Sequence, residues 1–194
     1  VIHLGVVEYQ AARLIQEKLA AEVAAGARPA TLLLLEHPHT YTFGRGGRLE
    51  NLLWDEAELE RKGVAVHWVD RGGDVTYHGP GQLVGYPILP LAPGGLQASL
   101  VGGARLPQVD YVGYLRRLER MLIHALASFG LDSHQEERLT GVWVYKPAGD
   151  SPPCLAKIAA IGVKVNAHGV SLHGFALSVN PDMSYWQGIV GCGL

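Results

Sequence analysis

The 194 residues are 48% hydrophobic and 18% charged, with a formal net charge of -2. This length fits one domain, or a large and a small lobe that share a core, and the apolar content is ample for that core. The near-neutral charge gives no global attraction to nucleic acid or to an anionic membrane. No apolar run approaches the ~20 residues of a membrane-spanning helix, and the first residues lack the pattern of a signal peptide. We therefore expect one cytoplasmic domain over residues 1–194, with no nucleic-acid or membrane partner.

Three segments have the periodicity or the capping residues of helices. Residues 10–25 carry apolar side chains at every fourth position, with charged residues on the other face. Residues 108–129 form the clearest apolar stripe and are followed by a glycine, which favours a helix end. Asp55 and Glu58 have the spacing of a capping box, which predicts a short helix that ends near Lys62.

Short apolar or alternating runs predict strands between and after these helices. Residues 89–106 are rich in glycine and proline, which predicts a long surface loop. Residues 182–187 predict a helical turn. Together the elements predict an α+β domain with a mixed or antiparallel sheet and helices packed on one side. The predicted strands are residues 31–35, 64–68, 141–145, 158–165 and 170–179.

The segment from Arg71 to Gln82 places four glycines among hydrogen-bonding and ionisable side chains. Glycines allow the backbone to approach a ligand and to direct N–H groups at it. A tight connection between strands with ordinary surface residues explains the same composition equally well. The segment is not a phosphate-binding P-loop, because no Gly-Lys-Ser/Thr follows, and the G-x-G-x-x-G spacing of a dinucleotide site is absent.

Three further segments accompany this one along the chain. They are residues 36–45 (EHPHTYTFGR), residues 157–163 (KIAAIGV) and residues 173–177 (HGFAL). In sequence and in order, the four segments closely resemble the lipoyl(octanoyl) transferases, whose fold is similar to that of lipoate and biotin protein ligases. The resemblance runs from about Leu32 to the end of the chain. Agreement across several segments is far more specific than any one loop.

The resemblance implies a biotin/lipoate protein ligase-like fold and an acyltransferase. Enzymes of this family move an octanoyl (or lipoyl) group from acyl carrier protein to a lysine of a lipoyl domain, as in 2-oxoacid dehydrogenase complexes and the glycine cleavage H protein. A cysteine carries the acyl group as a thioester, with a lysine beside it, and these map onto Cys192 and Lys157. No cofactor and no metal is implied.

The acyl-binding residues of the family map onto three stretches of this sequence. They are Arg71, Gly72, Gly73, Asp74, Val75, Thr76, Tyr77, His78, Ala160, Ile161, Gly162, Gly174, Phe175 and Ala176.

Two features depart from the family pattern. Gly191 stands before the cysteine, where the family usually has proline, and this difference would loosen the loop that holds the thiol. The family's chains continue beyond the cysteine, whereas this sequence stops at Leu194, so we expect a C-terminal tail that is missing here.

For each single residue, an ordinary structural role is an alternative to the functional one. Lys157 and Lys164 are seven positions apart, so in an unbroken strand they face opposite ways, and we expect Lys164 to be the exposed one. A bulge at Gly162 would undo this argument. Cys192 alone would be a stray thiol near a chain end, and Cys154, which matches no motif, is interpreted as structural; both thiols are expected to be reduced.

The histidines also have two interpretations. His78 and His173 each precede a glycine and could line an acyl pocket, although structural histidines are the more common case. His37 and His39 are two apart and could share a metal, but no third ligand is evident, which favours structural roles.

Two other functions remain as alternatives. An ATP-dependent lipoate or biotin ligase on the same fold would activate a free acid as an adenylate and would need no cysteine. A non-catalytic protein could use the same pocket to bind acyl groups.

Overall fold

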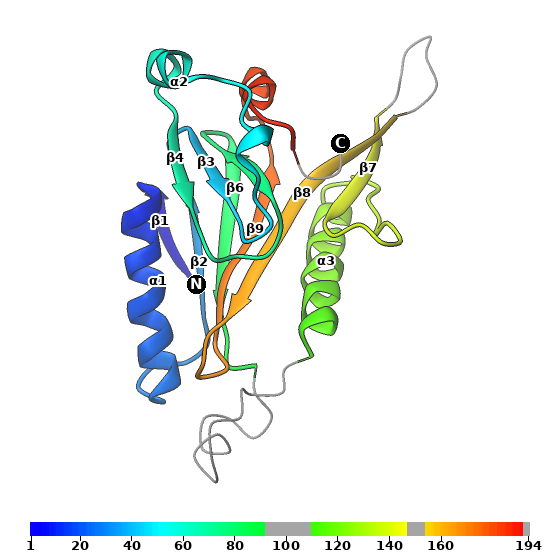
Figure 1. Ribbon diagram of the computed structural model, residues 1–194. Coiled ribbons are helices and arrows are strands. Elements are labelled where there is room, and N and C mark those ends of the chain that lie inside the picture. The colour runs from blue at the N-terminus through cyan, green and yellow to red at the C-terminus, as the bar shows by residue number, and fades with distance from the viewer. Residues whose placement is uncertain (92–109, 147–153, 192–194) are drawn as a thin grey trace.

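The computed structural model describes residues 1–91, 110–146 and 154–191 (Figure 1). The described chain forms a six-stranded sheet, a three-stranded sheet, three α-helices and two 3-10 helices. The helices are α1 Tyr9–Ala24, α2 Glu56–Lys62 and α3 Tyr111–Ala127, with the 3-10 helices η1 Leu49–Asn51 and η3 Met183–Gly188.

The larger sheet has the strand order β1-β2-β6-β9-β8-β7. β1 and β2 are parallel, and the other neighbours are antiparallel, so the sheet is mixed. The neighbouring strands β8 and β9 pair without a register shift, with Ile161 opposite Phe175. The six strands are β1 Ile2–Val6, β2 Thr31–Glu36, β6 Gln82–Ile88, β7 Val142–Lys146, β8 Cys154–Val165 and β9 Ser171–Ser178.

The smaller sheet has the order β4-β3-β5, with β3 Thr40–Phe43 in the middle, β4 Ala65–Trp68 parallel to it and β5 Val75–His78 antiparallel. Its core is aromatic, because Tyr41 and Phe43 are fully buried with the β5 side chains. β5 is joined to β6 by a short turn, so the chain passes directly from the smaller sheet into the larger one (Figure 1).

Alternation along β2 places the two long helices on opposite faces of the larger sheet. Leu33 and Leu35 pack with α1, whereas Leu34 packs with Leu122 and Leu126 of α3, and successive strand residues point to opposite faces. Figure 1 shows α1 and α3 on the two sides of the sheet. The predicted α+β class and the mixed sheet are confirmed, but the helices do not share one side.

The three predicted helices are present and begin or end within a few residues of the expected positions. The Asp55 side chain accepts a hydrogen bond from the Glu58 backbone N–H at 2.9 Å, as an N-cap residue does. All five predicted strands and the predicted turn after Asp182 are also present, the turn as η3. The predicted loop over residues 89–106 falls almost wholly outside the described residues.

Four strands escaped the sequence analysis: β1, β3, β5 and β6. β5 lies inside the glycine-dense segment from Arg71 to Gln82 and β6 begins at its last residue, whereas β1 and β3 are short. Within the described part of the chain, no helix combines the length and apolarity that crossing a bilayer requires.

Packing of α1 on the sheet yields a stability test. Leu19 is 6% exposed in the core between α1 and the sheet, whereas Leu14 on the same helix is 65% exposed. We expect Leu19→Ala to lower the free energy of unfolding by about 2–5 kcal/mol, because it leaves a cavity. The control Leu14→Ala should change it by no more than about 0.5 kcal/mol. Urea unfolding followed by circular dichroism measures both, and equal losses would contradict the described packing.

Candidate active site

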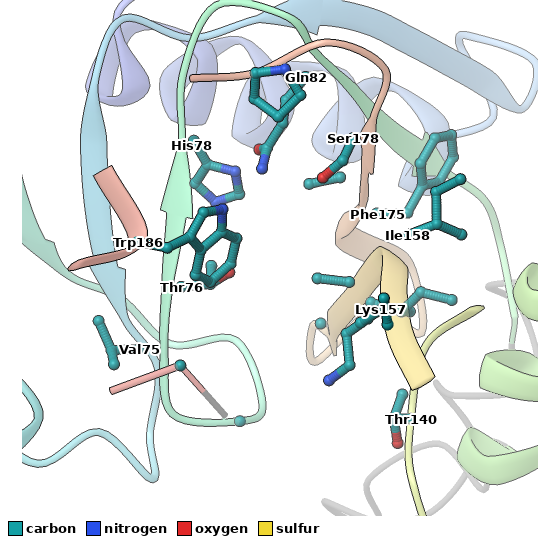
Figure 2. A pocket seen from close by; sticks show the side chains of 18 of the residues that line it. Val75, Thr76, His78, Gln82, Thr140, Lys157, Ile158, Phe175, Ser178 and Trp186 are labelled. Atoms are coloured by element: carbon teal, nitrogen blue, oxygen red, sulfur yellow. The ribbon is translucent and has the colours of Figure 1, made fainter. Parts of the chain in front are cut away.

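A cavity of about 1050 Å³ is lined by residues from both sheets and from η3. One wall comes from the segment Arg71–His78, the other from β8 and β9, and Trp186 of η3 lies beside the first wall (Figure 2). Its lining is mostly apolar, which suits a hydrocarbon chain with a few polar groups that fix orientation.

The cavity wall at Arg71 is held by hydrogen bonds to the preceding motif. The Arg71 guanidinium is buried and donates to the Thr42 carbonyl oxygen at 2.6 Å and to the Thr42 hydroxyl at 2.9 Å. Backbone N–H groups of Arg45 and Gly46 donate to the carbonyl oxygens of Arg71 and Gly73, both at 3.0 Å. A Cβ on Gly44 would overlap the Gly73 carbonyl oxygen, so this close approach requires glycine. The segments 36–45 and 71–78, which the sequence presented as separate motifs, are therefore one structural unit.

The same loop is hydrogen-bonded directly to β8. The Gly72 N–H donates to the Val163 carbonyl oxygen at 3.2 Å. The Tyr111 hydroxyl of α3 donates to that carbonyl as well, at 2.6 Å. These bonds bring the loop and the KIAAIGV strand together although they are some 90 residues apart in the sequence.

The structure places most of the sequence-predicted site residues around this one cavity. Asp74 and Tyr77 do not line it: Asp74 accepts from the Arg48 and Val75 backbone N–H groups, and Tyr77 packs in the core of the smaller sheet. Cys192 lies outside the described residues. The predicted residues that line the cavity are Arg71, Gly72, Gly73, Val75, Thr76, His78, Lys157, Ala160, Ile161, Gly162, Gly174, Phe175 and Ala176.

Lys157 extends from β8 into the cavity (Figure 2). Its ammonium nitrogen lies 4.7 Å from the ring centroid of Trp143, the residue opposite it on β7. Trp143 is 1% exposed, so the cation rests on a desolvated aromatic face, where a cation–π contact is strongest. Lys157 itself is half-buried, and its side chain is confined between the cavity and the indole.

Lys164 is not part of the lining of this cavity. It forms an ion pair with Asp70, whose other carboxylate oxygen is 3.0 Å from Nε2 of His173. Burial raises the pKa of Asp70, but the hydrogen bonds from Lys164 and His173 outweigh it and lower this pKa to about 2. Lys164 is therefore half-buried and paired, whereas the sequence analysis expected it to be exposed.

The buried end of the cavity is made of tyrosines and histidines. Tyr9, Tyr86, His78 and His173 line it, and each is less than 8% exposed. Burial lowers the pKa of His78 well below its ordinary value, with further lowering from His37 and Arg71. Burial also lowers the pKa of His173, against the opposing effect of Asp70. Both imidazoles are thus neutral at pH 7, which keeps this end of the cavity free of positive charge from histidine.

His37 and His39 do not face one another as a ligand pair. His37 is fully buried, with Nδ1 donating to the Val7 carbonyl oxygen and Nε2 accepting from the Tyr86 hydroxyl, both at 2.7 Å. His39 stacks on Tyr185 instead. Both make structural contacts, and His37 supports the Tyr86 side of the cavity.

Several cavity residues were missed by sequence analysis. Tyr9 and Tyr86 look like ordinary core residues in their own segments, and Trp186 lies in a turn with no motif. Cys154, interpreted as structural, is exposed at the start of β8 and lines the cavity, where it is a free thiol. Arg138, Leu139 and Thr140 precede β7 and complete the wall beside Lys157. No local pattern marks these positions, because only the tertiary fold brings them together.

Comparison with known proteins assigns the family. The sequence pattern described as "Lipoyl protein ligase A/B catalytic domain" matches residues 8–193. The chain belongs to this family. The octanoyltransferase of Solibacter usitatus is 48% identical over 191 residues, which cover 98% of this chain and 76% of the relative. That of Chloroflexus aurantiacus is 47% identical over 192 residues, or 99% of this chain and 77% of the relative.

Solved structures of lipoyl protein ligases share the fold of this family member. The bipartite lipoate protein ligase of Thermoplasma acidophilum superposes with a TM-score of 0.65 at 16% identity, over 100% of this chain and 66% of that one. A lipoate-protein ligase A bound with ATP superposes with a TM-score of 0.58 at 15% identity, over 98% of this chain and 74% of that one. The biotin/lipoate protein ligase-like fold expected from the sequence is confirmed.

The buried histidines predict how stability depends on pH. Burial lowers the pKa of His37 to about 4, whereas a histidine in the unfolded chain titrates near 6.5. Between these values the unfolded state binds more protons, so the free energy of unfolding falls as the pH falls. At about 1.4 kcal/mol per pKa unit, His37 alone accounts for a loss on the order of 3 kcal/mol by pH 4.

Urea unfolding between about pH 7 and pH 4.5 tests this dependence. We expect His37→Gln to flatten the decline, because one group that is neutral in the folded state has been removed. Exposed His124 provides the control, since His124→Gln should leave the slope as it is in the wild type. Identical slopes in all three proteins would show that His37 charges freely in the folded state.

Proposed function

We propose that this protein transfers an octanoyl group from acyl carrier protein to a lysine of a lipoyl domain, through a thioester on Cys192. The observation that carries the proposal is that Gly191, which directly precedes Cys192, lines the same cavity as Lys157. Relatives named octanoyltransferase, 44–48% identical to this chain, support octanoyl transfer as the reaction. The lipoyl domains of 2-oxoacid dehydrogenase complexes and the glycine cleavage H protein are the acceptors we propose. The cytoplasmic location expected from the sequence stays a prediction.

The first half reaction makes the acyl-enzyme. The Lys157 ammonium beside Cys192 would favour the thiolate, which is the nucleophilic form of cysteine. The thiolate attacks the carbonyl carbon of the octanoyl thioester, and the bond from that carbon to the carrier sulfur breaks. Lys157 gives its proton to the departing sulfur. One thioester replaces another, so the step has little net free-energy change.

The second half reaction makes the amide. Lys157, now neutral, accepts a proton from the incoming lysine amine, and the amine attacks the acyl-cysteine carbonyl. The Cys192 sulfur leaves as the thiolate and the Lys157 ammonium is regenerated. A thioester is already activated relative to an amide, so the balance needs no ATP. The Gly72 N–H already donates to Val163, so the backbone N–H of Gly73 is the candidate of this segment to stabilise the tetrahedral oxyanion.

The cavity offers the apolar surface that an octanoyl chain needs. Val75, Ile161 and Phe175 are apolar side chains of its lining, and each methylene that leaves water contributes about 0.8 kcal/mol. Because the histidines at the buried end are neutral, the chain would meet no histidine charge there.

The decisive assay mixes the protein with octanoyl-acyl carrier protein and a lipoyl domain and measures the intact mass of the lipoyl domain. We expect a gain of one octanoyl group without ATP. A parallel reaction with free octanoate and ATP separates transfer from ligation, since product only in that arm would identify an adenylating ligase. No product in either arm, with octanoyl carrier still bound, would identify an acyl-binding protein.

Cys192→Ser tests the nucleophile. A serine hydroxyl is a far weaker nucleophile than a thiolate at neutral pH, so the variant should neither form an acyl-enzyme nor transfer the octanoyl group. Mass spectrometry after incubation with octanoyl carrier measures the adduct, with Cys154→Ser as the matched control that should still acylate. An octanoyl mass on the Cys192 variant that disappears in the double variant would assign the nucleophile to Cys154.

Lys157→Ala tests the proton carrier. Loss of a positioned acid and base typically costs about 100- to 10,000-fold in rate, and we expect both half reactions to slow by an amount in this range. Rapid-quench measurement of acyl-enzyme formation and of its discharge to the lipoyl domain separates the two steps. Lys164→Ala on the same strand is the control and should keep the wild-type rate in both. A Lys157 variant as fast as this control would remove Lys157 from the mechanism.

A further inference from the structure

Glu119 is a carboxylate in the middle of the buried face of α3. It is 0% exposed, and its neighbours on that face are apolar, including Leu118 and Leu122. A buried charge is tolerated only where hydrogen bonds or an ion pair offset its desolvation. The partners of Glu119 therefore indicate what this charge holds in place.

Those partners, apart from one arginine, belong to the connection between α3 and β7. One carboxylate oxygen accepts from the Gly141 backbone N–H at 2.9 Å. The other accepts from the Gln135 side-chain amide at 2.7 Å and from Arg116 of the same helix at 2.8 Å. Glu119 thus fastens both ends of the segment 135–141 to the helix.

The fastened segment forms the wall of the cavity beside Lys157. Arg138, Leu139 and Thr140 line the cavity between the two fastened ends, and Thr140 lies beside Lys157 in Figure 2. Gly141 has a φ of +125° and lies against the side chain of Lys157. A Cβ on Gly141 would be 3.3 Å from Cδ and 3.4 Å from Cε of Lys157, and 2.6 Å from the Ala159 carbonyl oxygen.

We propose that Glu119 is a positioning residue, whose carboxylate holds Gly141 against the aliphatic part of Lys157 and so fixes the ammonium over Trp143 at the cavity. Glu119 reaches the reacting atoms only through Gly141 and Lys157, so it is not itself catalytic. The proposal rests on the proposed function for the consequence in catalysis, but its geometric part concerns Lys157 alone.

Glu119→Gln is the variant that tests this role. A glutamine presents one acceptor and one NH₂ group, where the carboxylate accepts from three donors. Either Gly141 or the pair of Gln135 and Arg116 must then face a donor, and the segment should loosen. The double variant Glu119→Gln with Gln135→Glu returns a carboxylate to the cluster and leaves the glutamine oxygen for Gly141, so we expect it to recover most of the loss.

The first readout is the reactivity of Lys157 towards an amine-labelling reagent, followed by peptide mass spectrometry across pH. Lys164 on the same strand serves as the internal reference. We expect Glu119→Gln to raise the labelling of Lys157 several-fold relative to Lys164, and hydrogen exchange at the Gly141 amide to accelerate. The second readout is kcat for octanoyl transfer, which should fall about tenfold or more, because small misplacements of catalytic groups are costly.

Glu136→Gln is the matched control, since Glu136 lies in the same segment but pairs with His134 instead of Gly141. It should leave the labelling ratio and kcat unchanged. If Glu119→Gln fails to fold, Glu119→Asp keeps the charge for Arg116, shortens the side chain by one methylene, and is measured in the same way.

A folded Glu119 variant with a lower melting temperature but an unchanged labelling ratio and kcat would overturn the proposal and leave Glu119 a purely structural residue. Absence of octanoyl transfer by the wild type would instead refute the proposed function. The labelling ratio and the exchange of Gly141 would still decide whether Glu119 positions Lys157.

Discussion

The site depends on the burial of one guanidinium. Arg71 is 7% exposed and donates to the Thr42 carbonyl, the Thr42 hydroxyl and the Gly72 carbonyl. A buried cation without such acceptors would be strongly destabilising, so the loop can adopt its position only when β3 of the smaller sheet is already in place. The loop in turn bonds through Gly72 to Val163 of the larger sheet. The cavity therefore forms only when both sheets are docked on the Arg71 segment. A partly folded chain would not contain one wall of the cavity without the other.

The groups that could change charge near pH 7 differ between the two ends of the cavity, with the Arg71 guanidinium as a fixed charge near the buried end. At the buried end, desolvation holds His78 and His173 neutral, and burial also raises the pKa of Tyr9 to about 12, so neither tyrosinate nor imidazolium forms near pH 7. At the other end, exposed Thr140 lies beside the half-buried Lys157 (Figure 2). An apolar ligand gains most where water is excluded, and proton transfer needs an ionisable amine where the two substrates arrive. The fold supplies a dry apolar region and an accessible amine in one cavity, because solvent exposure increases from one end of it to the other.

The sequence predicted the elements that depend on local pattern. The stripe of α3 and the cap of α2 are properties of neighbouring residues, and both were placed correctly. It failed for β5, which has only four residues between glycines, and for β6, whose Gly85 looks like a loop residue until the Phe175 ring packed against it is known. The odd spacing of Lys157 and Lys164 along one strand placed them on opposite faces. It could not reveal that Asp70, from a distant loop, pairs with Lys164. Likewise Glu119 resembles an ordinary helix residue, since its partners at residues 135 and 141 are close to it only in space.

The shape of the cavity constrains the order of events in the proposed reaction. In the proposed reaction both substrates are carried by folded proteins, one as a thioester and the other as a lysine amine, and both would have to reach Lys157. That residue lies at the exposed end, between the wall of residues 138–140 and the start of β8. If both approach this end, they would exclude each other, and the acyl group would have to remain while the first carrier leaves and the second enters. A covalent thioester meets this requirement, because it retains the octanoyl chain in the apolar part of the cavity without help from either carrier. The nucleophile proposed next to Lys157 would therefore suit the access to the cavity as well as the chemistry of the acyl group.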